Sequence, residues 1–229
     1  MANSNRKYDT ADEVDKKYPK LPNLIKAKLG LKPHLDQLVN DKSPLVKLNI
    51  IEHGHKDHLD KLVNDPEPWI REIVATHRHK DHLDKLVNDP DGRVREAVAK
   101  YGNKGHLDKL VNDSQDTVRQ AVAKRGHKDH LDKLVKDKNY GVREAVAFRG
   151  HKDHLDKLVN DKDSYVRRAV ARKGSKEHLD RLVDDEDYGV RRFVAKRGDR
   201  EHLDKLLGDK NRMVKEVKRR LKEFQNGKS

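Results

Sequence analysis

The sequence contains no cysteine. This excludes disulfides, thiolate zinc sites, iron–sulfur clusters and cysteine nucleophiles. The sequence also lacks any stretch approaching the roughly 18 apolar residues of a membrane span. Its first residues, MANSNRKYDTADEVDKKY, hold no apolar run of the kind found in secretion signals. We therefore expect a cytoplasmic protein that makes no membrane contact.

Apolar and aromatic residues are scarce. Hydrophobic residues make up 33% of the chain and aromatic residues 4%, whereas charged residues make up 41%. Such a composition is thin for a compact globule but suits an elongated molecule with much surface to solvate. The 53 Lys and Arg outnumber the 40 Asp and Glu, giving a net charge of +13. This excess favours nucleic acid or acidic proteins as partners.

One tripeptide, His-Leu-Asp, is repeated along the chain with a spacing of 24 residues. It occurs eight times, beginning at His34, His58, His82, His106, His130, His154, His178 and His202. A period this short cannot enclose a separate core in each repeat, so neighbouring repeats must stack and share one continuous core. Below, positions within a repeat are counted from this histidine as position 0.

Each repeat reads as two short helices. In residues 82–105, HLDKLVNDPDGRVREAVAKYGNKG, apolar residues fall at positions 1, 4 and 5 and again at 12, 15 and 16. Each set is spaced for one face of a helix. The intervening Asn-Asp-Pro-Asp-Gly is a turn with an Asp able to cap the second helix, and Gly102 at position 20 is suited to end that helix in the left-handed conformation.

These motifs resemble a known superfamily. Asp-Pro-Asp precedes Val-Arg-Glu-Ala-Val-Ala at 94–99, and related segments lie at 118–123 and 142–147. The pattern resembles HEAT-like repeats, and the 24-residue period resembles the leucine-rich repeat variant proteins, in which an α-helix alternates with a shorter, often 3₁₀, helix. Their Asn-Pro turn is replaced here by Arg-Gly or Lys-Gly, and the iron–sulfur domain of one branch is missing. The resemblance implies an all-α, right-handed α-solenoid of eight two-helix repeats with terminal caps, and implies no function.

The repeat boundaries predict four parts. We expect a flexible N-terminal segment over 1–20, an N-terminal cap over 21–33, the solenoid over 34–209, and a C-terminal capping helix and tail over 210–229. In the N-terminal cap, Leu24 and Ile25 are predicted to close the first layer of the core. The C-terminal helix carries an apolar stripe. Its members are Met213, Val214, Val217, Leu221 and Phe224.

Most positions that recur in every repeat are interpreted as scaffold. The histidines at position 0 are predicted to form a half-buried ladder. Histidine also recurs three residues earlier, at His55, His79, His127 and His151, but no third ligand type accompanies these pairs, so we predict no metal and no cofactor. Arg at position 13 and Asp at position 7 are predicted to bond across adjacent repeats. Asp at position 2 and Lys or Arg at position 3 are predicted to form a solvated face.

Positions 18 and 19 become basic from the third repeat onward, and these residues predict a track for a phosphate backbone. The predicted nucleic-acid-binding residues are Lys100, Tyr101, Lys124, Arg125, Arg149, Arg172, Lys173, Lys196 and Arg197. Position 22 is predicted to add a second basic row, Lys56, Lys80, Lys104, Lys128, Lys152, Lys176 and Arg200. Only Tyr101 and Phe148 interleave the first stripe, too few for base stacking, so binding should be directed by charge and shape and fall steeply with salt.

A second variable set lies at positions 10 and 11, in the turn between the two helices. Its aromatic members are Trp69, Tyr140, Tyr165 and Tyr188. Exposed aromatic residues along one edge are typical of protein interfaces, and packing of each ring over the neighbouring turn is the structural alternative.

No catalytic constellation interrupts the repeats, and the sequence contains no phosphate-binding loop, so we expect no enzymatic activity. HEAT-like alkylpurine DNA glycosylases are a remote alternative, but they use several tryptophans with an Asp, and this chain has only Trp69. Two hypotheses stay open. The chain is a scaffold that contacts nucleic acid or a nucleoprotein complex, or it is an adaptor or inhibitor solenoid that binds an acidic protein surface.

Overall fold

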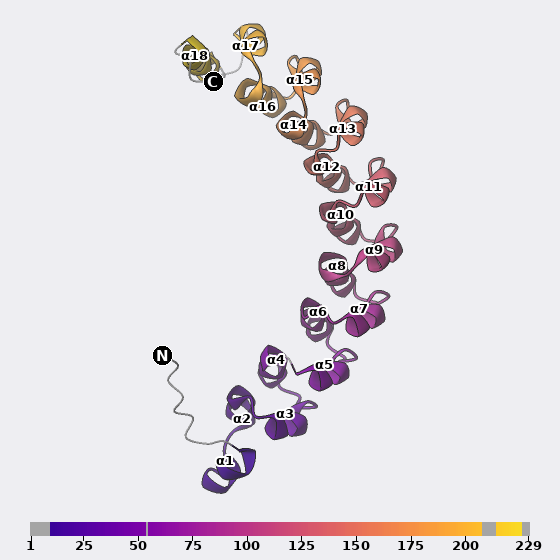
Figure 1. The fold of residues 1–229 in the computed structure, drawn as a ribbon, viewed down its shortest axis with the longest axis vertical. Helices are drawn as coiled ribbons and strands as arrows, with labels where there is room; N and C mark the ends of the chain where they lie inside the picture. The colour runs from indigo at the N-terminus through magenta and orange to yellow at the C-terminus, as the bar shows by residue number, and fades with distance from the viewer. Residues whose placement is uncertain (1–9, 54, 208–213, 226–229) are drawn as a thin grey trace. The chain divides into compact units, whose positions relative to one another are not determined.

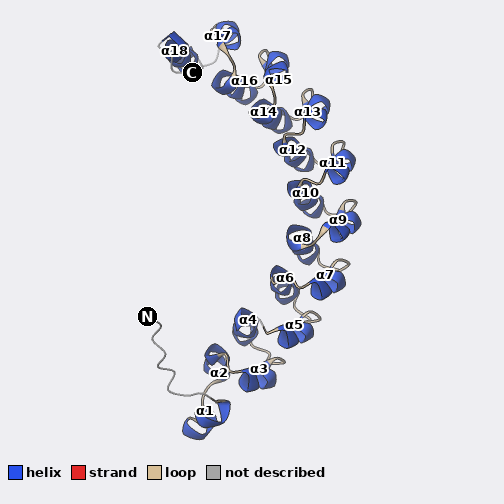
Figure 2. Ribbon diagram, viewed as in Figure 1, coloured by secondary structure: helices blue, strands red, loops and turns tan. Residues whose placement is uncertain are grey.

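The computed structural model describes residues 10–53, 55–207 and 214–225, and in the last segment it describes the side chains of residues 217–222. The described residues form 18 helices and no strand (Figures 1 and 2). Backbone contacts divide the chain into two units, residues 1–106 and 107–229, with the boundary inside the helix Lys104–Leu110. Each unit is described by itself.

Longer and shorter helices alternate along both units. The longer helices, of nine or ten residues, are α4 (Pro44–His53), α6 (Pro68–Thr76), α8 (Gly92–Tyr101), α10 (Asp116–Arg125), α12 (Tyr140–Arg149), α14 (Ser164–Lys173) and α16 (Tyr188–Arg197), and α2 (Asn23–Leu29), with seven residues, belongs to the same layer. The shorter helices are α3 (Lys32–Leu38), α5 (Lys56–Leu62), α7 (Lys80–Leu86), α9 (Lys104–Leu110), α11 (Lys128–Leu134), α13 (Lys152–Leu158), α15 (Lys176–Leu182) and α17 (Arg200–Leu206). These shorter elements are α-helical, not 3₁₀.

The two helices of each repeat belong to two layers. Within residues 1–106, α2, α4, α6 and α8 contact one another in succession, and within residues 107–229 the same holds for α10, α12, α14 and α16. The short helices form the second layer of each unit (Figure 1). The repeats therefore stack as a two-layered α-solenoid, as the sequence predicts.

The core lies between the layers and uses the predicted positions. In the third repeat Leu83, Leu86 and Val87 of the short helix and Val94 and Val98 of the long helix are almost fully buried. Alanine at positions 15 and 17 is buried as well, at Ala97 and Ala99. Small residues here let consecutive long helices pack closely.

Four long helices begin as predicted, because the turn supplies a side-chain cap, whereas α6 and α10 begin after Glu67 and Gln115 without one. Asp91, Asp163 and Asp187 accept hydrogen bonds from backbone N–H groups in the first turns of α8, α14 and α16, and Asn139 does so for α12. These bonds satisfy amides that the helix leaves unpaired.

The long helices end in two different ways, so the predicted left-handed glycine holds only in part. Gly30, Gly126 and Gly150 have φ of 67°, 76° and 74°. Glycines 102, 174 and 198 are instead extended. In the extended cases the following residue is Asn103, Ser175 or Asp199, whose side chain lies at the start of the next short helix and contacts its N3 histidine.

The N-terminal segment differs from the expectation of a flexible stretch over 1–20. Residues Ala11–Lys17 form α1, which Thr10 caps, and Ala11 and Val14 are buried. Asp15 of this helix lies 2.6 Å from Lys26 Nζ of α2. One buried face of two small apolar residues is too short a pattern to show helical periodicity in the sequence. Residues 1–9 lie outside the described residues.

The two predicted caps are helical. The N-terminal cap contains α2, but Leu24 is half-buried and Ile25 is 41% exposed, so the expectation that they close the core is wrong; Ala27 is the buried residue there. The C-terminal cap is α18 (Val214–Gln225), which contacts α16 and α17 and buries Val217 fully. Of the rest of the predicted stripe, Leu221 is half-buried, and the side chains of Met213, Val214 and Phe224 lie outside the description. No helix in the described part of the chain is long and apolar enough to cross a bilayer.

Candidate nucleic-acid interface and the inter-repeat ladders

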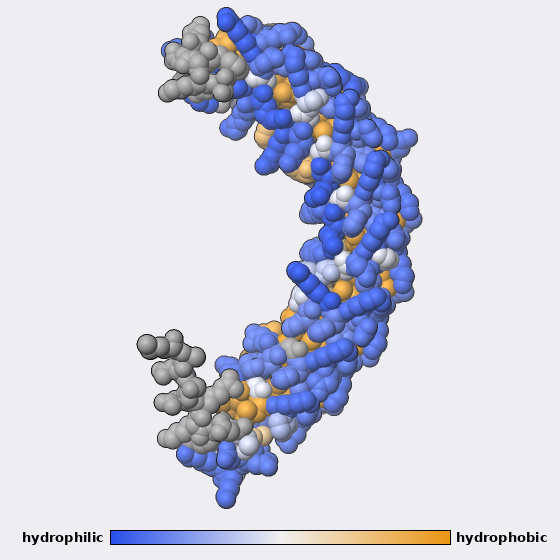
Figure 3. Space-filling model, viewed as in Figure 1, coloured by the Kyte–Doolittle hydropathy of each residue, from blue (hydrophilic) through white to orange (hydrophobic). Residues whose placement is uncertain are grey.

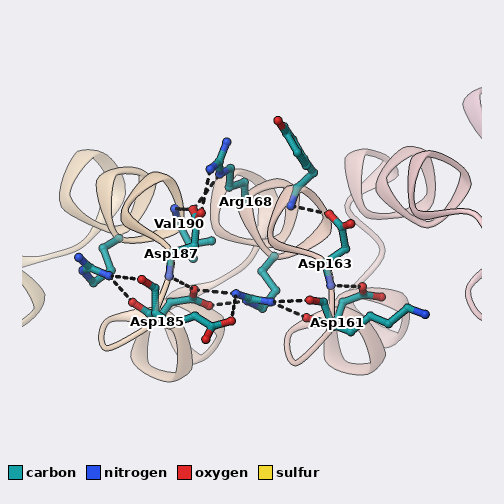
Figure 4. Close-up of polar contacts among 11 residues, drawn as sticks. Asp161, Asp163, Arg168, Asp185, Asp187 and Val190 are labelled. Carbon is teal, nitrogen blue, oxygen red and sulfur yellow. Dashed lines mark hydrogen bonds and ion pairs between the residues drawn. The ribbon is translucent and has the colours of Figure 1, made fainter.

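The arginines at position 13 join consecutive repeats, as predicted. Arg143 donates from Nε and Nη2 to the carboxylate of Asp161 in the next repeat, at 2.6 and 2.8 Å. Its Nη1 donates to the backbone carbonyls of Asp137 and Lys138 in its own turn. Arg71, Arg119 and Arg167 make the same contacts with Asp89, Asp137 and Asp185 (Figure 4 shows Asp161 and Asp185). These arginines are largely buried and are not available to a ligand.

The histidines at position 0 form a ladder that is fully buried, not half-buried as expected. All eight are at most 2% exposed. Nε2 of His82 lies 2.6 Å from Asp60 Oδ1 at position 2 of the preceding repeat, and His58, His130 and His154 make equivalent hydrogen bonds. Asp at position 2 is therefore both a surface residue and a partner of the next repeat, where the sequence predicted a solvated residue alone.

Three members of the ladder also contact the start of their own short helix. The backbone N–H groups of Asn103, Ser175 and Asp199 donate to Nδ1 of His106, His178 and His202. Nε2 of His106 lies 3.0 Å from Asp84 Oδ1 of the preceding repeat, and Nε2 of His178 and of His202 is buried without a hydrogen-bond partner. In His58, His82, His130 and His154, Nδ1 is buried without a hydrogen-bond partner. A scaffold role explains this histidine in either case.

The second basic row, at position 22, is matched by carboxylates, which the prediction of a basic track did not take into account. Lys56, Lys80, Lys128, Lys152, Lys176 and Arg200 all lie within 4 Å of the aspartate four residues further on. Lys128 and Lys152 also approach an acidic residue of the next repeat. This row is part of an alternating salt-bridge surface on the short-helix layer, which leaves it little net charge to attract a polyanion.

Among the described residues, one group of side chains has metal-ligand spacing: Asp36, Asp57 and His58. The Lys32 ammonium already lies between the two carboxylates, 3.2 Å from Asp36 and 2.5 Å from Asp57. The consecutive histidines at positions 21 and 0 pack edge to face, with ring centroids 5.1 to 5.6 Å apart. Two metal ligands need their nitrogen lone pairs to converge in the ring planes, and edge-to-face packing does not provide that. Absence of a resident metal stays a prediction.

The predicted stripe separates into two rows with different roles. At position 19, Nη1 of Arg197 donates to the carbonyls of Ala171 and Gly174 at 2.9 Å each, and Nη1 of Arg149 donates to the carbonyl of Lys124 at 3.3 Å. These carbonyls belong to the C-terminal end of the long helix in the preceding repeat. Arg149 and Arg197 therefore satisfy acceptors that a helix end leaves unpaired. Tyr101 at the same position lies under the guanidinium of Arg78, 5.1 Å away.

Position 18 carries exposed cations as well, and Lys173 at position 19 is exposed with no carbonyl or carboxylate partner among the described residues. Lys124, Arg172 and Lys196 are exposed on α10, α14 and α16. Arg172 lies over the ring of Phe148, whose exposed fraction is 37%, with 5.4 Å to the centroid. Lys124 is held by the neutral amide of Gln120 at 3.0 Å. Lys100, in contrast, is paired with Glu96 at 2.7 Å, which removes it from an exposed positive surface.

Helices α14 and α16 supply the strongest local charge. Their sequences, SYVRRAVARK and YGVRRFVAKR, each contain four basic residues and no acidic one. Carboxylates of the turns hold Arg167 and Arg168, the latter by two 2.9 Å bonds to Asp187 (Figure 4), and Arg191 donates to turn carbonyls. Five basic residues of these helices stay exposed with no ion-pair partner among the described residues, and one of them, Arg197, donates to backbone carbonyls instead. We call Arg172, Lys173, Arg192 and Lys196 the cationic face.

Sequence reasoning missed Arg192. It stands at position 14, where Glu72, Glu96 and Glu144 precede it. The change of sign at that position was the available signal. Arg125, which the sequence also predicted, is half-buried at the end of α10.

Three of the four predicted interface aromatics are exposed. Tyr140, Tyr165 and Tyr188 are 47%, 53% and 40% exposed and lie in the first turns of α12, α14 and α16, just inside the helices. The rings of Tyr140 and Tyr165 are 5.8 Å apart, and Arg168 lies over the ring of Tyr165. Trp69 is half-buried at the equivalent place in α6.

Comparisons with known proteins address the fold. No family model matches the chain, and no curated protein matches it. Among solved structures, a leucine-rich repeat variant with a novel repetitive structural motif superposes with a TM-score of 0.69 at 23% identity, covering 92% of this chain and 85% of that one. The chain has the leucine-rich repeat variant fold. A computationally designed armadillo repeat protein for modular peptide recognition also matches, with a TM-score of 0.24 at 14% identity over 87% of this chain and 97% of that one.

Proposed function

We propose that this leucine-rich-variant solenoid is a non-enzymatic scaffold that binds the phosphate backbone of nucleic acid, free or in a nucleoprotein complex, through its cationic face. The observation that carries the proposal is the exposure of Arg172, Lys173, Arg192 and Lys196 on the adjacent helices α14 and α16, with no ion-pair partner among the described residues. Elsewhere, the basic rows at positions 13 and 22 are matched by carboxylates.

The arrangement suits a polymer better than a small ligand. Packed helices lie about 8 to 10 Å apart, so the cations of α14 and α16 repeat at that interval along the layer of long helices, and α12 carries Phe148 at the equivalent position. Lys124 on α10 extends the same row toward the start of the unit. Such a row attracts an anion by charge and spacing and reads no base edge, so binding should be insensitive to sequence.

A salt titration of binding to random-sequence duplex and single-stranded DNA tests the proposal. Neutralising about four phosphates predicts a slope of log K against log salt of about −3 to −4 for duplex. The variant R172Q/K173Q/R192Q/K196Q should lose most of this affinity. Affinity that is flat across salt, or unchanged in the variant, would refute the proposal.

The matched control removes four charges from the paired row. In K56Q/K128Q/K152Q/K176Q the net charge falls by the same amount, but each lysine removed is already close to a carboxylate. This variant should bind nearly as the parent does. Equal losses in both variants would mean that net charge alone, and no particular face, governs binding.

An acidic protein surface is the second candidate, and the exposed tyrosines favour it. Tyrosine and arginine are enriched among residues that dominate protein interfaces, and Tyr165 with Arg168 forms such a pair. Polyglutamate serves as the probe. If it binds with loss in Y140S/Y165S/Y188S while DNA does not bind, the protein hypothesis replaces the nucleic-acid one.

A further inference from the structure

The long-helix layer of residues 1–106 carries an exposed apolar surface that the core does not use. Its side chains lie on the consecutive helices α2, α4 and α6, which contact one another. Ile25 is 41% and Leu45 57% exposed, and the other members are half-buried. We call Leu24, Ile25, Leu45, Leu48, Trp69 and Ile73 the apolar face. Figure 3 shows hydrophobic side chains at the surface over α2 and α4.

Leu24, Leu45, Leu48 and Trp69 stand at positions 11 and 14, outside the core, whereas Ile25 and Ile73 stand at position 15, where most later repeats bury an alanine. On α4 the core is made by Val46, Ile50 and Ile51, which are at most 3% exposed, and Leu45 and Leu48 lie on the other side of the same helix. Positions 11 and 14 hold Arg93 and Glu96 in the next repeat, and beyond it they hold polar residues or glycine except for Tyr165 and Met213 at position 11. A contiguous apolar surface on a chain that is 41% charged marks an interaction site.

The border of the apolar face is acidic, in contrast to the net charge of the chain. Glu52 and Glu67 are exposed and Glu72 is half-buried, and none of the three has an ion-pair partner among the described residues. Lys28 at position 18 of α2 is one basic exception, and Arg93 and Lys100 on α8 interact electrostatically with Glu72. Unpaired carboxylates beside apolar side chains are complementary to a segment that is apolar on one side and basic on its flanks.

We propose that the apolar face binds a basic amphipathic helix of a protein partner. Such a helix presents apolar residues at i, i+3, i+4 and i+7, which matches a surface built across three parallel rows of side chains. Its flanking lysines or arginines meet Glu52, Glu67 and Glu72. A phosphate polymer or an anionic lipid surface is repelled by the same carboxylates. This site is separate from the cationic face and does not depend on it.

Trp69 makes the proposal directly measurable, because it is the one tryptophan of the chain and belongs to the apolar face. The probe is a synthetic amphipathic peptide with leucine on one face and lysine elsewhere. Its addition to the full chain should shift Trp69 emission to the blue, saturably, as water is excluded from the indole. The same peptide with glutamate in place of lysine should not bind.

Two variants and one control locate the site. Leu45→Gln removes the most exposed apolar side chain from a surface position, so the fold should persist, and it should weaken peptide binding about tenfold. The double variant E52Q/E72Q should weaken it through the flanking charges. Tyr165→Gln, at the same repeat position in residues 107–229 and 53% exposed, is the matched control and should bind like the parent.

Three results would overturn the proposal. The first is unchanged peptide affinity in Leu45→Gln. The second is equal binding of the lysine and glutamate peptides, because the carboxylate border then plays no part. The third is a dimer of the chain without peptide, detected by sedimentation and abolished by Leu45→Gln, which would make a second copy the occupant. DNA binding by the cationic face is measured separately, so its failure leaves this result intact.

Discussion

The guanidinium of Arg197 donates to the backbone carbonyl of Gly174 in the preceding repeat, at 2.9 Å, and to that of Ala171 at the same distance. Its sequence neighbour Lys196 points outward and lies 6.0 Å from the ring of Phe193 on its own helix. Two adjacent basic residues therefore have different roles. One closes the end of a helix in the neighbouring repeat, and the other stays available to a partner.

Exchanging each of these residues for glutamine should separate the roles. Arg197→Gln should lower the free energy of unfolding by about 1 kcal/mol, because two carbonyls lose a charged donor. Lys196→Gln should change it by less than about 0.5 kcal/mol and should weaken DNA binding instead. Urea denaturation and the salt titration measure the two effects. Weaker DNA binding by folded Arg197→Gln than by Lys196→Gln would contradict the assignment.

The arginines at position 13 should contribute far more to stability. Arg143 is 5% exposed and bonds both Asp161 and its own turn, so Arg143→Ala leaves a carboxylate uncompensated near the core. We expect a loss of about 3 to 5 kcal/mol in the free energy of unfolding. The control is Arg93→Ala, whose partner Asp91 lies 3.0 Å away at the surface, and it should cost less than about 1 kcal/mol. Similar costs for both would show that burial adds nothing to this pair.

The repeat made most of the fold predictable. Core positions, turn caps and the Arg–Asp ladder all recur every 24 residues, so one interpretation of residues 82–105 applies to the whole solenoid. Position 13 and position 7 could be paired because a guanidinium and a carboxylate are chemically complementary. The two ends do not follow the repeat, and there the prediction was wrong for α1 and for Leu24 and Ile25.

The sequence could not show that the basic stripe divides into two rows with different roles. Arg197 and Arg149 bond backbone carbonyls. Every residue has such a carbonyl, so the sequence does not indicate which arginines will bond one at a helix end. The pairing of Lys56 with Asp60 was visible as an i, i+4 spacing, but the prediction treated the lysine row apart from its acidic neighbours. The buried His–Asp contact joins residues 22 apart in the chain, a spacing that no single helix face suggests.

Glycine at position 20 should matter where its backbone is left-handed. Gly150 has φ of 74°, and a methyl group added there would have Lys173 Cβ as its nearest atom, 3.8 Å away. Gly150→Ala should therefore cost about 1 to 2 kcal/mol through the backbone alone. Gly105→Ala is the control, because Gly105 lies in the first turn of α9 without a positive φ, and an added methyl group there would lie 3.3 Å from the Asn103 side chain. It should change the free energy of unfolding by less than about 1 kcal/mol. Urea denaturation compares the two, and a neutral Gly150→Ala would contradict the left-handed assignment.

The contacts of Asp60, with Lys56 on its own helix and with His82 of the next repeat, should make stability depend on acid pH. Lys56, and next His82, lower the pKa of Asp60 from 3.8 to about 2. A carboxylate with a depressed pKa stabilises the folded state fully above its unfolded pKa, and that contribution disappears as the pH falls from about 4 to about 2. Asp60→Asn should thus be less stable than the parent near neutral pH, and the difference should close across this window. The measurement is the urea midpoint at several pH values.

The control is Asp81→Asn, which removes a carboxylate 3.7 Å from Lys56 but no histidine contact, and it should show a smaller difference from the parent at neutral pH. An Asp60→Asn midpoint equal to that of the parent at neutral pH would mean that the ladder orders the repeats without stabilising them.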